Sequence, residues 1–145
     1  MQRHHIVMIA CIIYSPVLAS CDMYLYASAT APLLAPVDSV CLKDALNKRL
    51  GAPSDGPVVE KSFGRRPASL WFYYDRVSFT QTYPDTGGST LIAAQVVAAG
   101  LFATRARFHR AQDSVSHQLG STILAVRDDC GGQSVPGRPE ITYPR

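Results

Sequence analysis

The chain has 145 residues, which suits one domain and is too short for two of ordinary size. Hydrophobic residues make up 47% of the sequence and charged residues 17%, a composition that excludes wholesale disorder. The formal net charge of +3 is too small to indicate nucleic acid as a partner.

The first twenty residues have the order of a secretory signal. Arg3 and two histidines precede an apolar run from Ile6 to Val17. This run is shorter than the ~20 residues that a membrane-spanning helix needs, so a permanent transmembrane anchor is not expected. Residues 1–20 are therefore predicted to be a signal peptide.

The signal segment ends in Leu18-Ala19-Ser20-Cys21: an aliphatic residue, two small residues and a cysteine. This sequence resembles the lipobox of bacterial lipoproteins, which signal peptidase II recognises. The resemblance implies cleavage after Ser20, a diacylglycerol on the Cys21 thiol and an acylated new amino terminus, with chains such as palmitate. Two or three acyl chains anchor a protein stably in a membrane, whereas one holds it only marginally.

Two alternatives remain for this segment: an ordinary cleaved signal that leaves Cys21 as a thiol, and a buried core helix. Asp22 resembles the residue that keeps lipoproteins of enteric bacteria in the inner membrane. It slightly favours the inner membrane over the outer, with the domain facing the periplasm. Residues 21–37 lack a clear period and contain Pro32 and Pro36, so they predict a lipidated cysteine followed by a tether.

A globular domain is predicted over residues 38–131. Asp38 is a good N-cap, and the apolar spacing of residues 39–50 predicts a helix that ends at Gly51. Residues 58–63 predict a short strand.

Residues 69–82 are rich in aromatic and β-branched side chains and predict one long strand. Residues 84–88 predict a turn, and residues 89–99 a partner strand that completes a hairpin, although their alanines leave a helix open.

From Arg107 to Cys130 apolar residues recur in steps of three and four, which predicts a second helix, with a bend at Gly120. Residues 132–145 contain three prolines and predict a flexible C-terminal tail.

After processing, Cys41 and Cys130 are the cysteines that remain besides Cys21. Each lies on the apolar stripe of a predicted helix, and the compartment is oxidising, so we predict a disulfide between them. Two buried free thiols are the alternative. The predicted fold is a small α+β domain of order α-β-β-β-α, with an antiparallel sheet packed by two helices.

Chemistry-bearing motifs are few. His109, Asp113 and His117 follow an i, i+4, i+8 pattern that resembles part of a metal site, but a solvated helix face is the preferred interpretation, so neither a metal nor another cofactor is predicted. For Asp75 and Arg76 we prefer a cross-strand pair on a solvated face over a ligand contact.

Arg105, Arg107 and Arg110 lie near the predicted start of the last helix. Basic residues near a helix start are common, so ordinary surface charges are the preferred interpretation, and contacts to lipid head groups or an acidic partner are the alternative.

The favoured function is a membrane-anchored, non-enzymatic binding or assembly module of the cell envelope, in contact with membrane lipid through Cys21 and with an envelope protein. One alternative is a ligand-sensing lipoprotein that uses a surface of Trp71, Tyr73 and Tyr74. The other is a metal-dependent hydrolase built on His109, Asp113 and His117.

Overall fold

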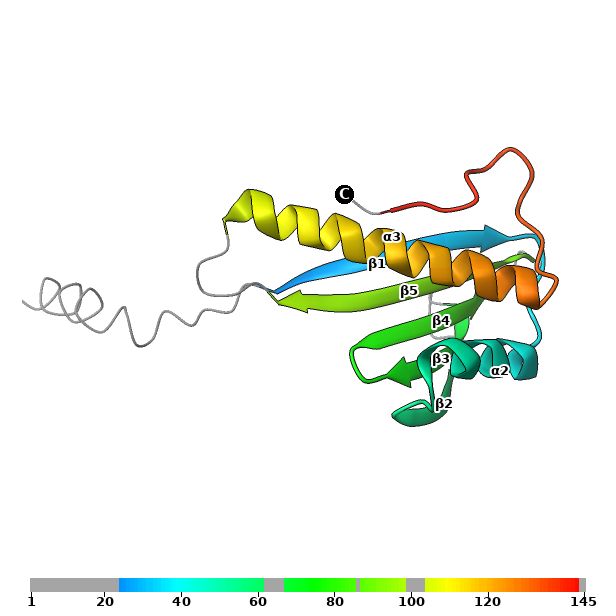
Figure 1. Ribbon diagram of the computed structural model, residues 1–145. Coiled ribbons are helices and arrows are strands. Elements are labelled where there is room, and N and C mark those ends of the chain that lie inside the picture. The colour runs from blue at the N-terminus through cyan, green and yellow to red at the C-terminus, as the bar shows by residue number, and fades with distance from the viewer. Residues whose placement is uncertain (1–23, 62–66, 86, 99–103, 144–145) are drawn as a thin grey trace, which may run out of the picture.

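The computed structural model describes residues 24–61, 67–85, 87–98 and 104–143. They form one layer of β-sheet with two helices on the same face (Figure 1). In chain order the elements are β1 (Tyr24–Leu33), α2 (Ser39–Leu50), β2 (Asp55–Glu60), β3 (Ala68–Tyr74), β4 (Val77–Tyr83), β5 (Ser89–Ala98) and α3 (Arg105–Asp129).

The five strands are antiparallel, in the order β1-β5-β4-β3-β2. One line of paired residues crosses four of them: Ala29 lies opposite Ala93, Ala93 opposite Phe79, and Phe79 opposite Phe72. All four side chains are buried against the helices. The predicted class, α+β with an antiparallel sheet packed by two helices, is confirmed.

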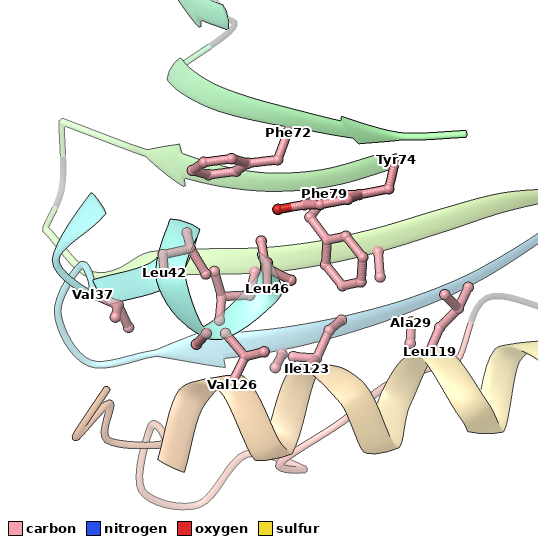
Figure 2. Close-up of a cluster of buried hydrophobic side chains, with 14 of the residues drawn as sticks. Ala29, Val37, Leu42, Leu46, Phe72, Tyr74, Phe79, Leu119, Ile123 and Val126 are labelled. Carbon is pink, nitrogen blue, oxygen red and sulfur yellow. The ribbon is translucent and has the colours of Figure 1, made fainter. Parts of the chain in front are cut away.

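Side chains on the inner face of the sheet grow larger from β1 toward β3 (Figure 2). Under α3, Ala27, Ala29 and Ala31 of β1 are fully buried, and such small residues let the helix lie close to the strand. The layer under α2 is built from larger side chains, namely Leu42, Leu46, Phe72, Tyr74 and Phe79. The core is therefore thin under α3 and thick under α2.

The first predicted helix is confirmed with both of its ends. The Asp38 carboxylate accepts hydrogen bonds from the backbone N–H groups of Val40 and Cys41, at 3.0 and 2.9 Å, which satisfies the free donors of the first turn. Gly51 follows the last turn at φ 85°, a conformation that favours glycine. The burial of Leu42 and Leu46 fixes the face that α2 turns to the sheet.

The second predicted helix is confirmed as α3, which is continuous from Arg105 to Asp129. Gly120 has a packing role within it. A Cβ atom at this position would lie 2.6 Å from the Tyr143 hydroxyl oxygen, so the absent side chain leaves room for the C-terminal segment against the helix.

The predicted tether is wrong for residues 24–33, which form β1. This strand pairs with β5 over its whole length, from Tyr24 opposite Ala98 to Leu33 opposite Ser89. Its inward positions are alanines followed by Leu33, and its outward positions are Tyr26 followed by Ser, Thr and Pro, so the period of two is present with little contrast in hydrophobicity. The folded unit therefore begins well before the predicted boundary at residue 38.

The single strand predicted over residues 69–82 is wrong, because the chain reverses at Asp75 and Arg76. Tyr74 pairs with Val77, which makes β3 and β4 a hairpin with a two-residue loop, and Asp75 takes a positive φ of 40°. The predicted strand at 89–99 is confirmed as β5, to Ala98. The strand predicted at 58–63 appears as β2 at 55–60, and residues 62–66 and 99 lie outside the described residues.

The C-terminal segment contacts β1 and α3 at several residues up to Tyr143, so it is not the free tail that was predicted over residues 132–145, of which 144 and 145 lie outside the described residues. Thr142 exchanges two backbone hydrogen bonds with Thr30 of β1, at 2.8 and 2.9 Å, and Ser134 bridges to Leu33. The Tyr143 ring lies 4.5 Å from the ring of His117 on α3. This segment covers part of the outer edge of β1.

The predicted disulfide is confirmed: Cys41 of α2 is bonded to Cys130 at the end of α3, with Cα atoms 5.8 Å apart. An ion pair of 2.6 Å between Arg49 and Asp129 lies next to it. The bond joins residues that are 89 positions apart in the sequence, so it links the two helices directly. The predicted signal, residues 1–20, and Cys21 lie outside the described residues.

We expect the double substitution Cys41→Ala and Cys130→Ala to lower the free energy of unfolding by about 4–5 kcal/mol, since a loop of this length loses much entropy when it is closed. Urea unfolding of the oxidised domain measures the change. Val40→Ala, an exposed substitution on the same helix, is the control. A loss below about 1 kcal/mol would contradict the role assigned to the bond.

Candidate functional site

An apolar groove of about 450 Å³ opens between α2 and the β2–β3 edge of the sheet. This volume falls within the range typical of small-molecule sites. The residues that line it are Ser39, Val40, Lys43, Pro57, Val59, Leu70, Phe72 and Tyr83.

The groove exists because α2 does not extend over β2, the strand at the edge of the sheet. Val59 pairs with Leu70 across β2 and β3, so both side chains point to the helical face. Leu70 is buried, but Val59 is 72% exposed and Val40, on the facing side of α2, is 64% exposed. Two valines thus form walls above a buried apolar floor. An adjacent pair of exposed apolar walls marks a binding site more often than scattered surface residues do.

Few polar groups enter the groove. Lys43 projects from the exposed side of α2, and within the described parts of the chain it forms no ion pair. The N–H groups of Val40 and Cys41 are already bonded to Asp38, so among the lining residues Lys43 is the positively charged group that an anion could meet. The groove therefore suits a ligand that has an apolar body and a negative charge.

Gln81 holds the groove in place from inside the fold. Its side-chain amide is fully buried, accepts a hydrogen bond of 2.8 Å from the Val37 N–H and donates one of 2.9 Å to the Val37 carbonyl. It also donates to the hydroxyl of Tyr83, at 2.7 Å. A buried amide with its partners satisfied fixes the segment before α2 on β4, and with it the spacing of the groove walls.

The edge strand β2 is poorly suited to receive another strand. Pro57 lacks an N–H group, and the pairing register shifts between Asp55 and Val58, as at a β-bulge. Both features are devices by which proteins protect sheet edges from pairing. The groove beside β2 is thus a more suitable binding surface than its backbone.

The three residues considered for a metal site are not brought together. His109 hydrogen-bonds to Gln112 of the same helix at 3.3 Å, and His117 packs on Tyr143. Across the described residues, no three His, Cys, Asp or Glu side chains form a group able to hold a metal ion. The structure supplies no support for the hydrolase alternative.

The proposed ligand surface of Trp71, Tyr73 and Tyr74 is divided between the two faces of the sheet. Trp71 and Tyr73 stack on the helix-free face, with ring centroids 6.0 Å apart. Tyr74 points into the core, where its hydroxyl donates to Asn47 at 2.8 Å and burial raises the pKa of its phenol. The three rings therefore form no common site.

Asp75 and Arg76 form the loop between β3 and β4 and are not a cross-strand pair. Their charged groups lie 3.8 Å apart on largely exposed side chains, an arrangement that contributes little to stability. Arg105, Arg107 and Arg110 are exposed at the start of α3, remote from the groove.

Two features of the sequence point to the groove. Val58 and Val59 are adjacent in a strand, so only one of them can face the core. Val40 also lies off the buried stripe of α2.

Comparison with known proteins adds little to this description. No family model matches the chain, and no curated protein matches it. Among solved structures, the chain is similar to the crystal structure of the di-domain ARO/CYC BexL from the BE-7585A biosynthetic pathway. The two are 11% identical with a TM-score of 0.37, and the match covers 93% of this chain and 61% of the BexL chain. A similarity of this size carries no inference about activity.

We expect the amphiphilic dye anilinonaphthalene sulfonate to bind in the groove, its rings on Val59 and its sulfonate near Lys43. Val59→Asp should weaken binding about ten-fold, because it places a charge on the apolar wall. Lys43→Gln should weaken it by about five-fold through loss of the ion pair. Dye fluorescence under titration measures both.

Val96→Asp is the matched control, since Val96 is also exposed but lies on the helix-free face of the sheet. Equal effects of the Val59 and Val96 substitutions would show that the dye binds elsewhere.

Proposed function

We propose that the protein is a lipoprotein of the bacterial cell envelope, acylated on Cys21, that binds an amphiphilic ligand in the groove between α2 and β2. The groove carries the binding half of this proposal, because it combines exposed apolar walls with one ammonium group. The lipobox-like sequence before Cys21 supports the anchored half. A non-enzymatic role agrees with a groove that offers one amine and two hydroxyls to orient a ligand.

The position of β1 determines where the groove lies relative to the proposed anchor at Cys21. Only two residues separate Cys21 from the first residue of β1, so the sheet begins within about 10 Å of the proposed anchor. Strand β1 has ten residues and spans about 33 Å. Pairing from Pro32 through Thr90 to Thr82 places Tyr83, and with it the groove, at the far end of this span. An acylated protein would thus present its groove away from the membrane, toward the periplasm.

Within the described residues no helix is long and apolar enough to cross a membrane. In this proposal attachment depends on the acyl chains of Cys21, and the choice between inner and outer membrane on the residues that follow it.

Intact mass and membrane fractionation of the full-length protein expressed in a bacterium test the anchor. We expect a mass equal to residues 21–145 plus acyl chains, and recovery with membranes. Cys21→Ala should abolish both, because the thiol is the acylated group. Cys11→Ala is the matched control: it removes a cysteine from the signal segment and should change neither result. A soluble, unacylated wild-type product would overturn the proposal.

A further inference from the structure

We infer that Arg105, Arg107 and Arg110 form a contact site for anionic phospholipid head groups, which orients the domain with the start of α3 against the membrane. This inference rests on the proposed acylation of Cys21. It adds a second, electrostatic contact to the lipid anchor and specifies which end of the molecule meets the bilayer.

The start of α3 and the start of β1 lie side by side (Figure 1). The Gln112 side chain donates a hydrogen bond of 2.8 Å to the Tyr26 carbonyl, which ties the two elements together. Tyr26 is five residues from Cys21, at most about 18 Å of extended chain. An acylated Cys21 therefore holds the arginines within reach of the head groups.

The arginines are exposed, and none forms an ion pair with a described residue. In the first eleven residues of α3 the only carboxylate is that of Asp113. Other interfacial features lie at the same end of the sheet: Tyr26 is 70% exposed and Val96 is 40% exposed. Aromatic and basic side chains together are typical of surfaces that meet a lipid head-group layer.

The charges in the first turn of α3 also oppose the helix dipole. The amino end of a helix favours anions, yet its first turn carries two arginines and no acidic residue. Its last turn contains Arg127 beside Asp128 and Asp129, and these carboxylates are paired with Arg127 and Arg49. The two arginines of the first turn thus cost helix stability, but they direct positive charge toward an anionic surface.

The test uses the acylated protein reconstituted into phosphatidylcholine vesicles with or without phosphatidylglycerol. A nitroxide on Ala106→Cys reports depth through its accessibility to oxygen and to a water-soluble nickel complex. With phosphatidylglycerol, we expect this label at the head-group layer. Each arginine lost should lower the ratio of docked to undocked protein about five-fold, so Arg105→Gln, Arg107→Gln and Arg110→Gln together should lower it about 100-fold.

A matched triple variant of Lys48, Lys61 and Arg138 to Gln removes the same charge elsewhere on the domain and should leave docking unchanged. A label on Gln118→Cys, farther along α3, should stay in water.

An acylated protein whose label stays in water in both kinds of vesicle would overturn this inference and leave the anchor intact. So would equal losses from the two triple variants. Absence of acyl chains in the mass spectrum would instead overturn the proposed function on which the inference rests.

Discussion

The close packing of α3 on β1 is the contact on which the rest of the structure depends. It is possible because the middle of β1 presents only alanine side chains to the helix, at Ala27, Ala29 and Ala31. Close packing of this kind gains many small dispersion contacts for each residue, although each alanine buries little area. The helix, held in this position, places Cys130 beside Cys41 and so fixes α2 over the aromatic half of the sheet.

The architecture separates the molecule into two ends with different chemistry. Where β1 enters the sheet, α3 begins with exposed arginines, and the proposed lipid anchor is only a few residues away. At the other end, α2 leaves part of the sheet uncovered, and the groove opens there. In the proposed account, one end of the molecule meets the membrane and the other binds a ligand, with a rigid sheet and no tether between them.

Elements with strong local signals were predictable from sequence: α2 from its cap and glycine stop, α3 from its periodicity, and the disulfide from the apolar position of both cysteines. Strand β1 was missed because alanine alternating with serine and threonine gives almost no hydrophobic contrast. The hairpin at Asp75 was missed because its loop contains neither glycine nor proline. The apolar positions 40, 58 and 59 were a local signal for the groove, but its extent depends on how far α2 covers the sheet, which no local pattern encodes.

Native-state hydrogen exchange of the β1 amides tests the central claim, that residues 24–33 are an integral strand and not a tether. We predict that the amides of β1 that bond to β5 exchange only through global unfolding, as slowly as those in the middle of β4. The amide hydrogen of Thr30, which is bonded to the Thr142 carbonyl, should exchange faster, since the C-terminal segment is held by fewer contacts. Exchange of the whole of β1 at the rate of an unstructured peptide would contradict the account.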